Sequence, residues 1–422
     1  MVFSSFALFR SIRIVGSSSN YCNFGKWSAR SGASCFNRRD FSTGTASEAV
    51  RNQHSPPWLM LPPESEGGTT SYKFYGLADN KVQTRSPSDV IGNLRLTCRG
   101  SSHGWLALLS QHDDGFFLYN PITRRHIKLP SILNLPTLPY VNILSSATYV
   151  KKVILSCSPD EDEENCRVVV MRACGNPLAF CCPGRSKDWT LMLDENRDDK
   201  RFYRDCVFST TRQNLFFGLT SHIELEIWDL GDPSSPKLIK YDDVEMENYD
   251  CLSSLERSAK ILLGRVEHLL LVKEDLLMVF QKVMEWVGPD GSCVNQYTPN
   301  KYRYMTIGFD IWKYYPEEGK FKYLDSSSLG GLAIFVGLLS HSVAIQASDF
   351  PDVKPGSVYF TDGYCTGTLG GDDDDVLCRG GHDIGIFNFQ NKTVSPCYYP
   401  CDLPSLKNIL PAPIWFFPSL TN

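Results

Sequence analysis

Residues 116–129 read FFLYNPITRRHIKL and predict one strand-turn-strand unit from which the fold can be worked out. The apolar run 116–119 has the composition of a short strand, and Asn120-Pro121 is a turn signal. Residues 125–129 then mix basic and apolar side chains, as in a strand that returns along a solvent-facing edge. The stretch therefore predicts a hairpin whose second strand lies at the outside of a sheet.

The same unit recurs three more times along the chain. In each copy an apolar run ends in an aromatic residue followed by Asn or Asp, and a short returning strand comes next. A strand, an amide or carboxylate at the turn and a returning outer strand are how a β-propeller blade closes. The anchors lie 109, 81 and 78 residues apart. Since a common blade needs roughly 40 to 50 residues, the copies carry insertions or skip blades. The anchors are Tyr119-Asn120, Trp228-Asp229, Phe309-Asp310 and Phe387-Asn388, and the returning strands are residues 125–129, 237–241, 320–324 and, in the poorest copy, 392–394.

Short strands also fill the rest of the chain beyond Pro56-Pro57. Runs rich in Val, Ile, Phe, Tyr and Trp alternate with Gly, Pro, Asn and Asp, which is the pattern of an all-β domain. Helical spacing is scarce; it occurs in residues 253–272, where apolar residues from Leu255 to Leu263 fit a helix but the second half equally fits a strand. Further expected strands are residues 104–109, 168–172, 214–219, 223–228, 304–309, 357–360 and 384–389.

We expect one all-β domain over residues 57–422, a kelch-like β-propeller of about six blades within a range of five to seven. A closed ring leaves no exposed sheet edges over about 360 residues that contain no clear linker. A pair of two-layer β-sandwiches would contain similar strands and is the structural alternative.

The first 39 residues have the composition of an organellar transit peptide. They contain nine Ser, five Arg and one Lys, and the first acidic residue of the chain is Asp40. Arg10 and Arg13 interrupt the apolar run 6–15, whereas a secretory signal needs an uninterrupted apolar stretch. A disordered basic tail on a cytosolic protein is the alternative.

Arg38-Arg39-Asp40-Phe41 resembles a mitochondrial processing site with cleavage after Phe41. We therefore expect residues 1–41 to be a disordered mitochondrial transit peptide and residues 42–56 to be a linker. The expected destination is the mitochondrial matrix, with the chloroplast as the alternative.

Composition and charge restrict the class of partner. The net charge is −5, and the basic leader leaves about −11 on the remainder, which argues against binding to a nucleic-acid backbone. The longest nearly apolar run, residues 329–339, is about half of the roughly 20 residues that a membrane-spanning helix needs, so no membrane span is expected. The 15 cysteines include no C-x-x-C pair, which favours reduced, buried thiols in a reducing compartment over zinc ribbons or thioredoxin-like sites.

Several strings resemble one plant family, the domain of unknown function 295, a kelch-like β-propeller domain found in many F-box proteins. The resemblance covers most of residues 57–417 and is weakest over about residues 140–300. Many members begin with an F-box, a helical module that docks onto a ubiquitin-ligase scaffold. Because the transit-like segment occupies that place here, the chain resembles an organellar branch that lacks the F-box, and the resemblance implies no reaction and no catalytic residues. The strings are residues 57–62, 100–106, 117–130, 347–351, 357–362 and 383–388.

Clustered acids and thiols are the candidates for metal chemistry. Asp372–Asp375 together with Asp383 offer oxygen ligands, but they lack the alternating spacing of a calcium loop, so a solvated insertion is expected there and at residues 160–164. A third group has the residue types of a zinc site, but its C-x₃-H and C-x₃-C spacings lack the flanking pairs of zinc modules. We therefore predict no catalytic, cofactor-binding or metal residues, although a Cys-His nucleophilic pair formed in space stays open. The third group is Cys365, Cys378, His382, Cys397 and Cys401.

Two motifs are interpreted as structural. His103-Gly104-Trp105 predicts a tight entry into a blade, with Trp105 buried and the imidazole satisfied by backbone. Arg124-Arg125 is expected to charge an outer edge strand.

No P-loop, G-x-S-x-G, H-E-x-x-H or dinucleotide-binding motif occurs in a suitable strand-helix context. We therefore expect a non-enzymatic organellar protein, a protein-interaction scaffold that uses one propeller face to hold an unidentified organellar protein, without a cofactor and without nucleic acid. The alternatives are an enzyme with its site in the central funnel and an F-box-like ubiquitin-ligase substrate receptor.

Overall fold

Strands make up almost all of the regular structure. The computed structural model describes residues 56–66, 69–78, 81–85, 96–110, 115–135, 150–172, 177–194, 201–246, 263–287, 303–363, 383–395, 397 and 412–419. The expected transit peptide, residues 1–41, and the expected linker up to residue 55 lie outside these ranges. Within them the helical turns are short 3-10 turns, namely η1 (Ile132–Asn134), η3 (Ser326–Leu329) and η4 (Ala347–Asp349).

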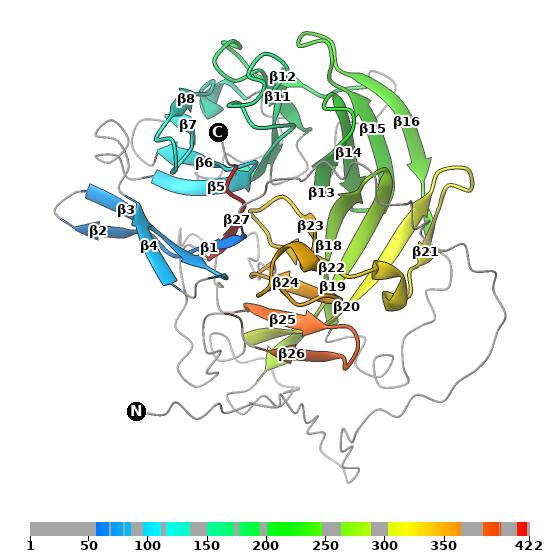
Figure 1. Ribbon diagram of the computed structural model, residues 1–422. Coiled ribbons are helices and arrows are strands. Elements are labelled where there is room, and N and C mark those ends of the chain that lie inside the picture. Colours follow the sequence, from blue (N-terminus) through cyan, green and yellow to red (C-terminus); the bar gives the residue numbers. More distant parts are fainter. Residues whose placement is uncertain are drawn as a thin grey trace, which may run out of the picture.

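The strands form six sheets, which we call blades 1 to 6 in chain order (Figure 1). The blades surround a common centre, and the strand named first in each blade lies nearest to it. Blade 1 contains β27 (Ile414–Phe416), β1 (Trp58–Met60), β3 (Thr69–Gly76) and β4 (Lys81–Arg85), with β2 (Glu64–Glu66) beside β3. Blade 2 contains β5 (Leu96–Ser102), β6 (Trp105–Ser110), β7 (Phe116–Tyr119) and β8 (His126–Lys128). Blade 3 contains β9 (Val150–Leu155), β10 (Val168–Arg172), β11 (Ala179–Cys181) and β12 (Thr190–Leu191).

The other three blades follow around the ring. Blade 4 contains β13 (Tyr203–Phe208), β14 (Leu215–Thr220), β15 (Glu224–Asp229) and β16 (Lys237–Asp243). Blade 5 contains β18 (Leu263–Val272), β19 (Asp275–Val287), β20 (Arg303–Tyr315), β21 (Lys320–Tyr323) and β17 (Glu245–Met246). Blade 6 contains β23 (Val343–Gln346), β22 (Leu332–Val336), β24 (Ser357–Phe360), β25 (Gly385–Asn388) and β26 (Thr393–Ser395). This confirms the expected six-bladed all-β propeller, and residues 263–272 of the helix candidate are strand β18.

The hydrophobic core is divided into six clusters, one at each interface between neighbouring blades. Side chains alternate between the two faces of a strand, so a buried strand can contribute to two clusters. In β27, Trp415 packs toward blade 6, whereas Ile414 and Phe416 pack toward blade 2. Because the sixth interface joins the last blade to the first, the sheets form a closed ring and the β-sandwich alternative is wrong.

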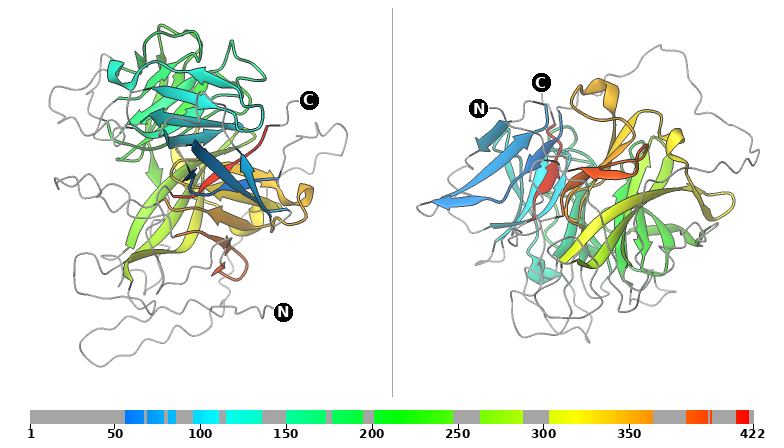
Figure 2. Two further views of the ribbon diagram at one scale, coloured as in Figure 1. Left: turned by 90° about the vertical axis from the view of Figure 1, so that its left-hand side faces the viewer. Right: turned by 90° about the horizontal axis from the view of Figure 1, so that it is seen from below.

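The last strand of the chain closes the ring inside the first blade. β1 pairs with β27 on one side and with β3 on the other, and Leu59 is opposite Trp415 and Tyr75. Figure 2 shows β27, in red, beside the blue strands of blade 1. Both ends of the described chain therefore belong to one sheet.

Three of the four repeat anchors lie on the third strand of a blade, and the fourth, Phe387-Asn388, lies on β25, the fourth strand of blade 6 from the centre. Tyr119, Trp228 and Phe387 lie at or next to the ends of β7, β15 and β25, whereas Phe309-Asp310 lies in the middle of the long strand β20. The four returning strands are β8, β16, β21 and β26. The anchors mark blades 2, 4, 5 and 6, so the first separation skips a blade and the later ones contain insertions.

His103 and Gly104 form the expected tight turn. They are the two residues between β5 and β6, and their φ values of 49° and 77° are both left-handed, as the type I′ turn of a two-residue hairpin requires. Trp105 directly after them is fully buried. A Cβ atom on Gly104 would lie 2.5 Å from Ser419 Oγ, so the chain end leaves no room for a side chain there.

Candidate functional site

Lys152 and Asp205 form an ion pair on the innermost strands of blades 3 and 4. Lys152 Nζ lies 2.6 Å from Asp205 Oδ1, and the side chains are 2% and 3% exposed. The second carboxylate oxygen accepts a hydrogen bond of 2.8 Å from the backbone N–H of Leu269, on the innermost strand of blade 5. Since an unpaired charge is costly in the interior, the pair joins three blades through one matched set of groups.

A chain of hydrogen bonds runs outward across blade 5 from His268, the neighbour of Leu269. His268 Nε2 lies 3.0 Å from Gln281 Oε1, and because an amide oxygen only accepts, the imidazole donates. Gln281 Nε2 donates in turn to the Thr306 hydroxyl at 2.6 Å. Burial lowers the pKa of His268, so the ring is neutral at pH 7.

Two carboxylates meet this chain on β20. The hydroxyl and the backbone N–H of Thr306 both donate to Asp383 Oδ2, the N–H at 2.8 Å. Two residues earlier, the Tyr304 hydroxyl donates to Asp362 Oδ2 at 2.6 Å. Side chains two residues apart share a strand face, so both carboxylates of blade 6 approach the same face of β20. We call the whole set the central polar chain; it comprises Lys152, Asp205, His268, Gln281, Thr306, Asp383, Tyr304 and Asp362.

The central polar chain is buried and its groups are directed at one another. Every member is at most 5% exposed. A general acid or base must come within hydrogen-bond reach of the substrate proton, whereas these carboxylates and the imidazole contact protein groups in the interior. The arrangement can hold blades 3 to 6 in register, but it does not present an acid–base pair to solvent.

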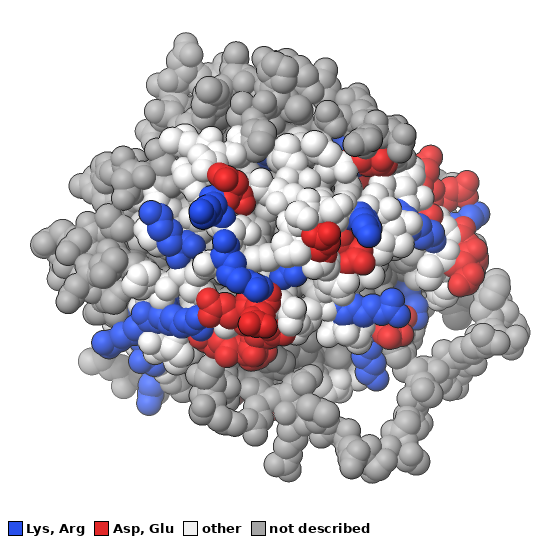
Figure 3. All heavy atoms as spheres, turned by 90° about the horizontal axis from the view of Figure 1, so that it is seen from above, with Lys and Arg blue, Asp and Glu red and all other residues white. Residues whose placement is uncertain are grey.

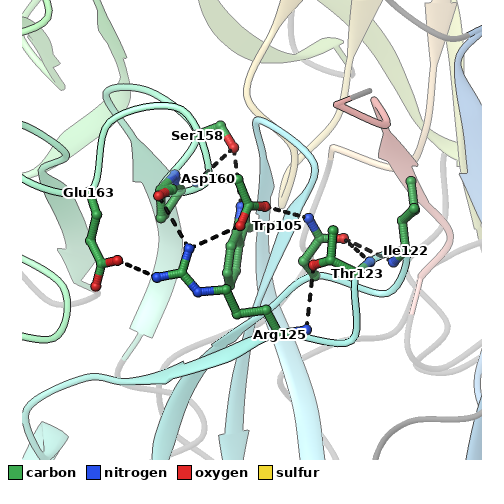
Figure 4. Close-up of polar contacts among 9 residues, drawn as sticks. Trp105, Ile122, Thr123, Arg125, Ser158, Asp160 and Glu163 are labelled. Atoms are coloured by element: carbon green, nitrogen blue, oxygen red, sulfur yellow. Dashed lines mark hydrogen bonds and ion pairs between the residues drawn. The ribbon is translucent and has the colours of Figure 1, made fainter. Parts of the chain in front are cut away.

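A second polar network joins blade 2 to blade 3 (Figure 4). Arg125 forms ion pairs with Asp160, at 3.0 Å, and with Glu163. Asn120 Nδ2 donates to the other oxygen of Asp160 at 2.8 Å. The expectation of a solvated insertion at residues 160–164 is therefore wrong for Asp160, whose side chain is 8% exposed, whereas the Glu163 side chain is 42% exposed. Arg125 accordingly bridges two blades, beyond the expected role of charging an edge.

The Trp105 ring packs against the Arg125 guanidinium and supports the same junction. The Arg125 guanidinium lies 5.7 Å from the centre of the Trp105 ring, within cation–π range. Trp105 Nε1 donates to Ser158 Oγ at 3.2 Å, at the start of the loop that carries Asp160. The Asn120 side chain also accepts from the N–H groups of Ile122 and Thr123, which fixes the turn. The stretch that predicts the blade hairpin thus also clamps the neighbouring blade.

The sequence candidates for metal binding are mostly outside the described residues. Asp372–Asp375, Cys365, Cys378, His382 and Cys401 fall in undescribed segments. Of the others, Asp383 belongs to the central polar chain and Cys397 is half-buried. Within the described ranges no three His, Cys, Asp or Glu side chains are grouped to hold a metal ion. The described cysteines other than Cys397 are free thiols and are buried.

Sequence reasoning missed most of the central polar chain. Lys152 and His268 stand in strands that mix charged with apolar residues, VKKVIL and LGRVEHLLLV. A charged or polar residue at a core position of a strand is the one signal that could have found them, because such residues are rarely buried without a partner. The partner of Lys152, Asp205, is 53 residues away in the sequence and could not be assigned from it.

The surface carries charges of both signs. On the face shown in Figure 3, acidic patches alternate with lysine and arginine side chains among the described residues. Such mixing does not provide the single-sign stripe that nucleic-acid backbones attract. No helix in the part of the chain that the structure describes has the length and apolarity to span a bilayer.

Comparison with known proteins gives one family match and distant relatives. The model of a family described as the KIB1-4 β-propeller matches residues 74–388. Two Arabidopsis thaliana proteins are similar: F-box/kelch-repeat protein At1g57790, 26% identical over 188 residues, and putative F-box protein At5g55150, 24% identical over 298 residues. The matches cover 44% and 68% of this chain, and 47% and 69% of the relatives, so the chain spans about half the length of the first relative.

Solved β-propellers align only loosely with this chain. The Cps50 (Swd1) β-propeller domain of Myceliophteria thermophila covers 80% of this chain and 88% of its own, with 8% identity and a TM-score of 0.30. A likeness at that TM-score carries no argument about this protein.

Proposed function

The chain belongs to the KIB1-4 β-propeller family, and on that premise we propose that it is a non-enzymatic interaction scaffold of an organelle, with the mitochondrion as its destination. The observation that supports it most directly is the burial of the central polar chain inside a closed ring. Groups with the chemistry for catalysis are engaged with each other there, which leaves turns and outer strands for contact with a partner. This disfavours the alternative of an enzyme with its site in the central funnel.

One edge of the ring is the better candidate for the contact surface. Because neighbouring strands within blades 2 to 5 are antiparallel, the turn between the first two strands and the turn between the last two share an edge. We call this edge the turn rim. Three of the five described non-glycine residues with positive φ lie in its turns, and strained backbone concentrates at functional sites. They are His103, Arg124 and Lys273.

Crosslinking inside the organelle tests this proposal. Tagged full-length chain would be imported, treated with a lysine-reactive crosslinker and analysed by mass spectrometry. We expect a reproducible protein partner, with crosslinks at Lys187 and Lys273 on the turn rim and not at Lys128, an exposed lysine at the other end of β8. Absence of a reproducible partner in independent preparations, or crosslinks spread evenly over these lysines, would contradict the scaffold.

Import is the second expected outcome. Residues 1–55 fused to a fluorescent reporter should direct it into mitochondria and be cleaved after Phe41. The triple variant Arg10→Gln, Arg13→Gln and Arg38→Gln should stay outside, because the positive charge of a transit peptide is needed for its uptake. A wild-type fusion found in the cytosol, or in chloroplasts, would overturn the mitochondrial destination.

An F-box-type substrate receptor is a second candidate function, favoured by the names of both Arabidopsis relatives. Our proposal instead places the chain in a branch of the domain-of-unknown-function-295 family that lacks the F-box. Co-purification with the adaptor subunit of a ubiquitin ligase separates the two. Stable binding that requires residues 1–55 would support the receptor, whereas import with cleavage would support the scaffold.

A further inference from the structure

Two tyrosine hydroxyls are buried between blades 1 and 2 without a hydrogen-bond partner. Tyr72 on β3 and Tyr119 at the end of β7 are 1% and 0% exposed. Their ring centres lie 6.1 Å apart, and neither hydroxyl has a protein partner. Buried hydroxyl groups nearly always have one, because an unmade hydrogen bond in the interior costs more than a made one gains. The fold itself therefore does not account for the burial of these two hydroxyl groups.

Arginines flank the pair. Arg85 on β4 is the register partner of Tyr72, and its guanidinium lies 6.0 Å from the centre of the Trp58 ring. Its buried Nε has no hydrogen-bond partner, while its NH2 donates to the Gln83 side chain in the same strand. The NH2 group of this guanidinium is thus held in place, whereas its Nε donor makes no hydrogen bond to the protein.

Arg124 approaches from the neighbouring blade. It is exposed and lies in the turn after Tyr119 with a φ of 61°. Burial raises the pKa of Tyr119, and the positive charges of Arg124 and Arg85 act against that rise. Among the described residues neither arginine forms an ion pair with a carboxylate, in contrast to Arg125 one residue later.

We propose that Tyr72, Tyr119, Arg85 and Arg124 form a binding site for a phosphate group. The unused groups are hydrogen-bond donors, and two guanidinium charges match a dianion with several acceptor oxygens. A water molecule would satisfy a phenol but would supply no counter-charge to the half-buried Arg85 guanidinium. The phosphate belongs either to a small soluble phosphate ester or to a phosphorylated side chain of a partner, and the site does not depend on the compartment or on the scaffold role.

Thermal unfolding of the full-length chain in inorganic phosphate tests the site. At constant ionic strength, phosphate in place of chloride is expected to raise the melting temperature saturably, since a ligand that binds only the folded state stabilises it. Tyr119→Phe and Arg85→Gln should each weaken the apparent affinity at least about tenfold. Arg212→Gln, which changes an exposed arginine in the turn before β14, should leave the response unchanged.

The behaviour of Tyr119→Phe without phosphate separates a ligand site from a structural role. Removing a hydroxyl that has no partner should leave the melting temperature equal to or above that of the wild type. No saturable response of the wild type, or a Tyr119→Phe variant that melts lower and keeps its phosphate response, would overturn the proposal in favour of bound water.

A second titration identifies the source of the phosphate. Phosphoserine and phosphotyrosine peptides would be compared with their unphosphorylated forms and with inorganic phosphate. Phosphopeptide binding at least about tenfold tighter than that of inorganic phosphate, lost in Arg124→Gln, assigns the site to a modified partner. Equal affinities assign it to a small phosphate ester.

Discussion

Removing residues 412–422 is expected to prevent the chain from forming a stable folded ring. This segment contains β27, whose residues are at most 2% exposed and fill two different interfaces. Without them blade 1 loses its innermost strand, and the apolar surfaces of blades 6 and 2 face water. We expect the truncated chain to lack a cooperative unfolding transition, measured by far-ultraviolet circular dichroism in urea.

A point variant tests the contribution of β27 in case the truncated chain does not fold. Trp415 is fully buried, with its ring centre 5.0 Å from that of Phe335 in an edge-to-face contact. Trp415→Ala should lower the free energy of unfolding by about 3–5 kcal/mol through lost burial and the cavity that remains. Phe202→Ala is the matched control, because this aromatic ring is 53% exposed, and it should cost within about 0.5 kcal/mol. Equal losses for the two variants would show that β27 does not close the ring.

The blade hairpins could be predicted because their signals are local. In the stretch around Asn120 the strand, the turn and the returning strand lie within about 14 consecutive residues, and the Asn120 side chain bonds to the backbone two and three residues on. The same local chemistry recurs at Asn388, which accepts from the N–H groups of Gln390 and Asn391. A motif whose side chain makes the hydrogen bonds of its own turn can be recognised in the sequence without knowledge of the rest of the fold.

Asp310 shows where this local reading fails. It has the same neighbours as the other anchors, yet it lies inside β20 and pairs with Lys282 at 2.7 Å across the sheet. Phe309 and Asp310 therefore mark a third strand but not its end. Strand length depends on pairing with β19, which is a long-range property that the anchor does not encode.

Blade 6 departs from the repeat for a similar reason. β22 pairs with β24 in parallel, which a chain of simple hairpins does not produce. The segment between β22 and β23 reaches blade 2 instead. There the Ser101 N–H donates to Leu339 O at 2.8 Å, and the Ser101 carbonyl accepts from the His341 N–H. Nothing local in residues 337–342 predicts a contact across the ring.

The central polar chain was also beyond sequence reasoning, because every link joins residues from different strands or loops. Gln281 and Thr306 are 25 residues apart, and Thr306 and Asp383 are 77 apart. Only Asp383 had been singled out, as a companion of the Asp372–Asp375 run, and its observed partner is Thr306. Registers that bring such residues together depend on the whole ring.

Replacing Lys152 by Met should lower the free energy of unfolding by about 3–5 kcal/mol, since breaking a buried ion pair leaves the remaining charge without compensation. Asp205 would keep its bond from Leu269 N–H but lose the Lys152 ammonium at 2.6 Å. Urea denaturation of the full-length chain at pH 7 measures this loss. Lys322→Met, which removes an exposed ion pair with Glu318, is the control and should cost at most about 1 kcal/mol.

The double variant Lys152→Met with Asp205→Asn shows whether the loss comes from the charge. Asn retains an oxygen that can accept from Leu269 N–H but carries no charge that must be compensated in the interior. We therefore expect it to recover part of the stability lost in Lys152→Met, even though it removes a second native group. If the double variant is less stable than Lys152→Met by the full cost of Asp205→Asn alone, the two side chains act independently. In that case the pair does not join blades 3, 4 and 5, and packing of their apolar faces would account for the alignment of the inner strands.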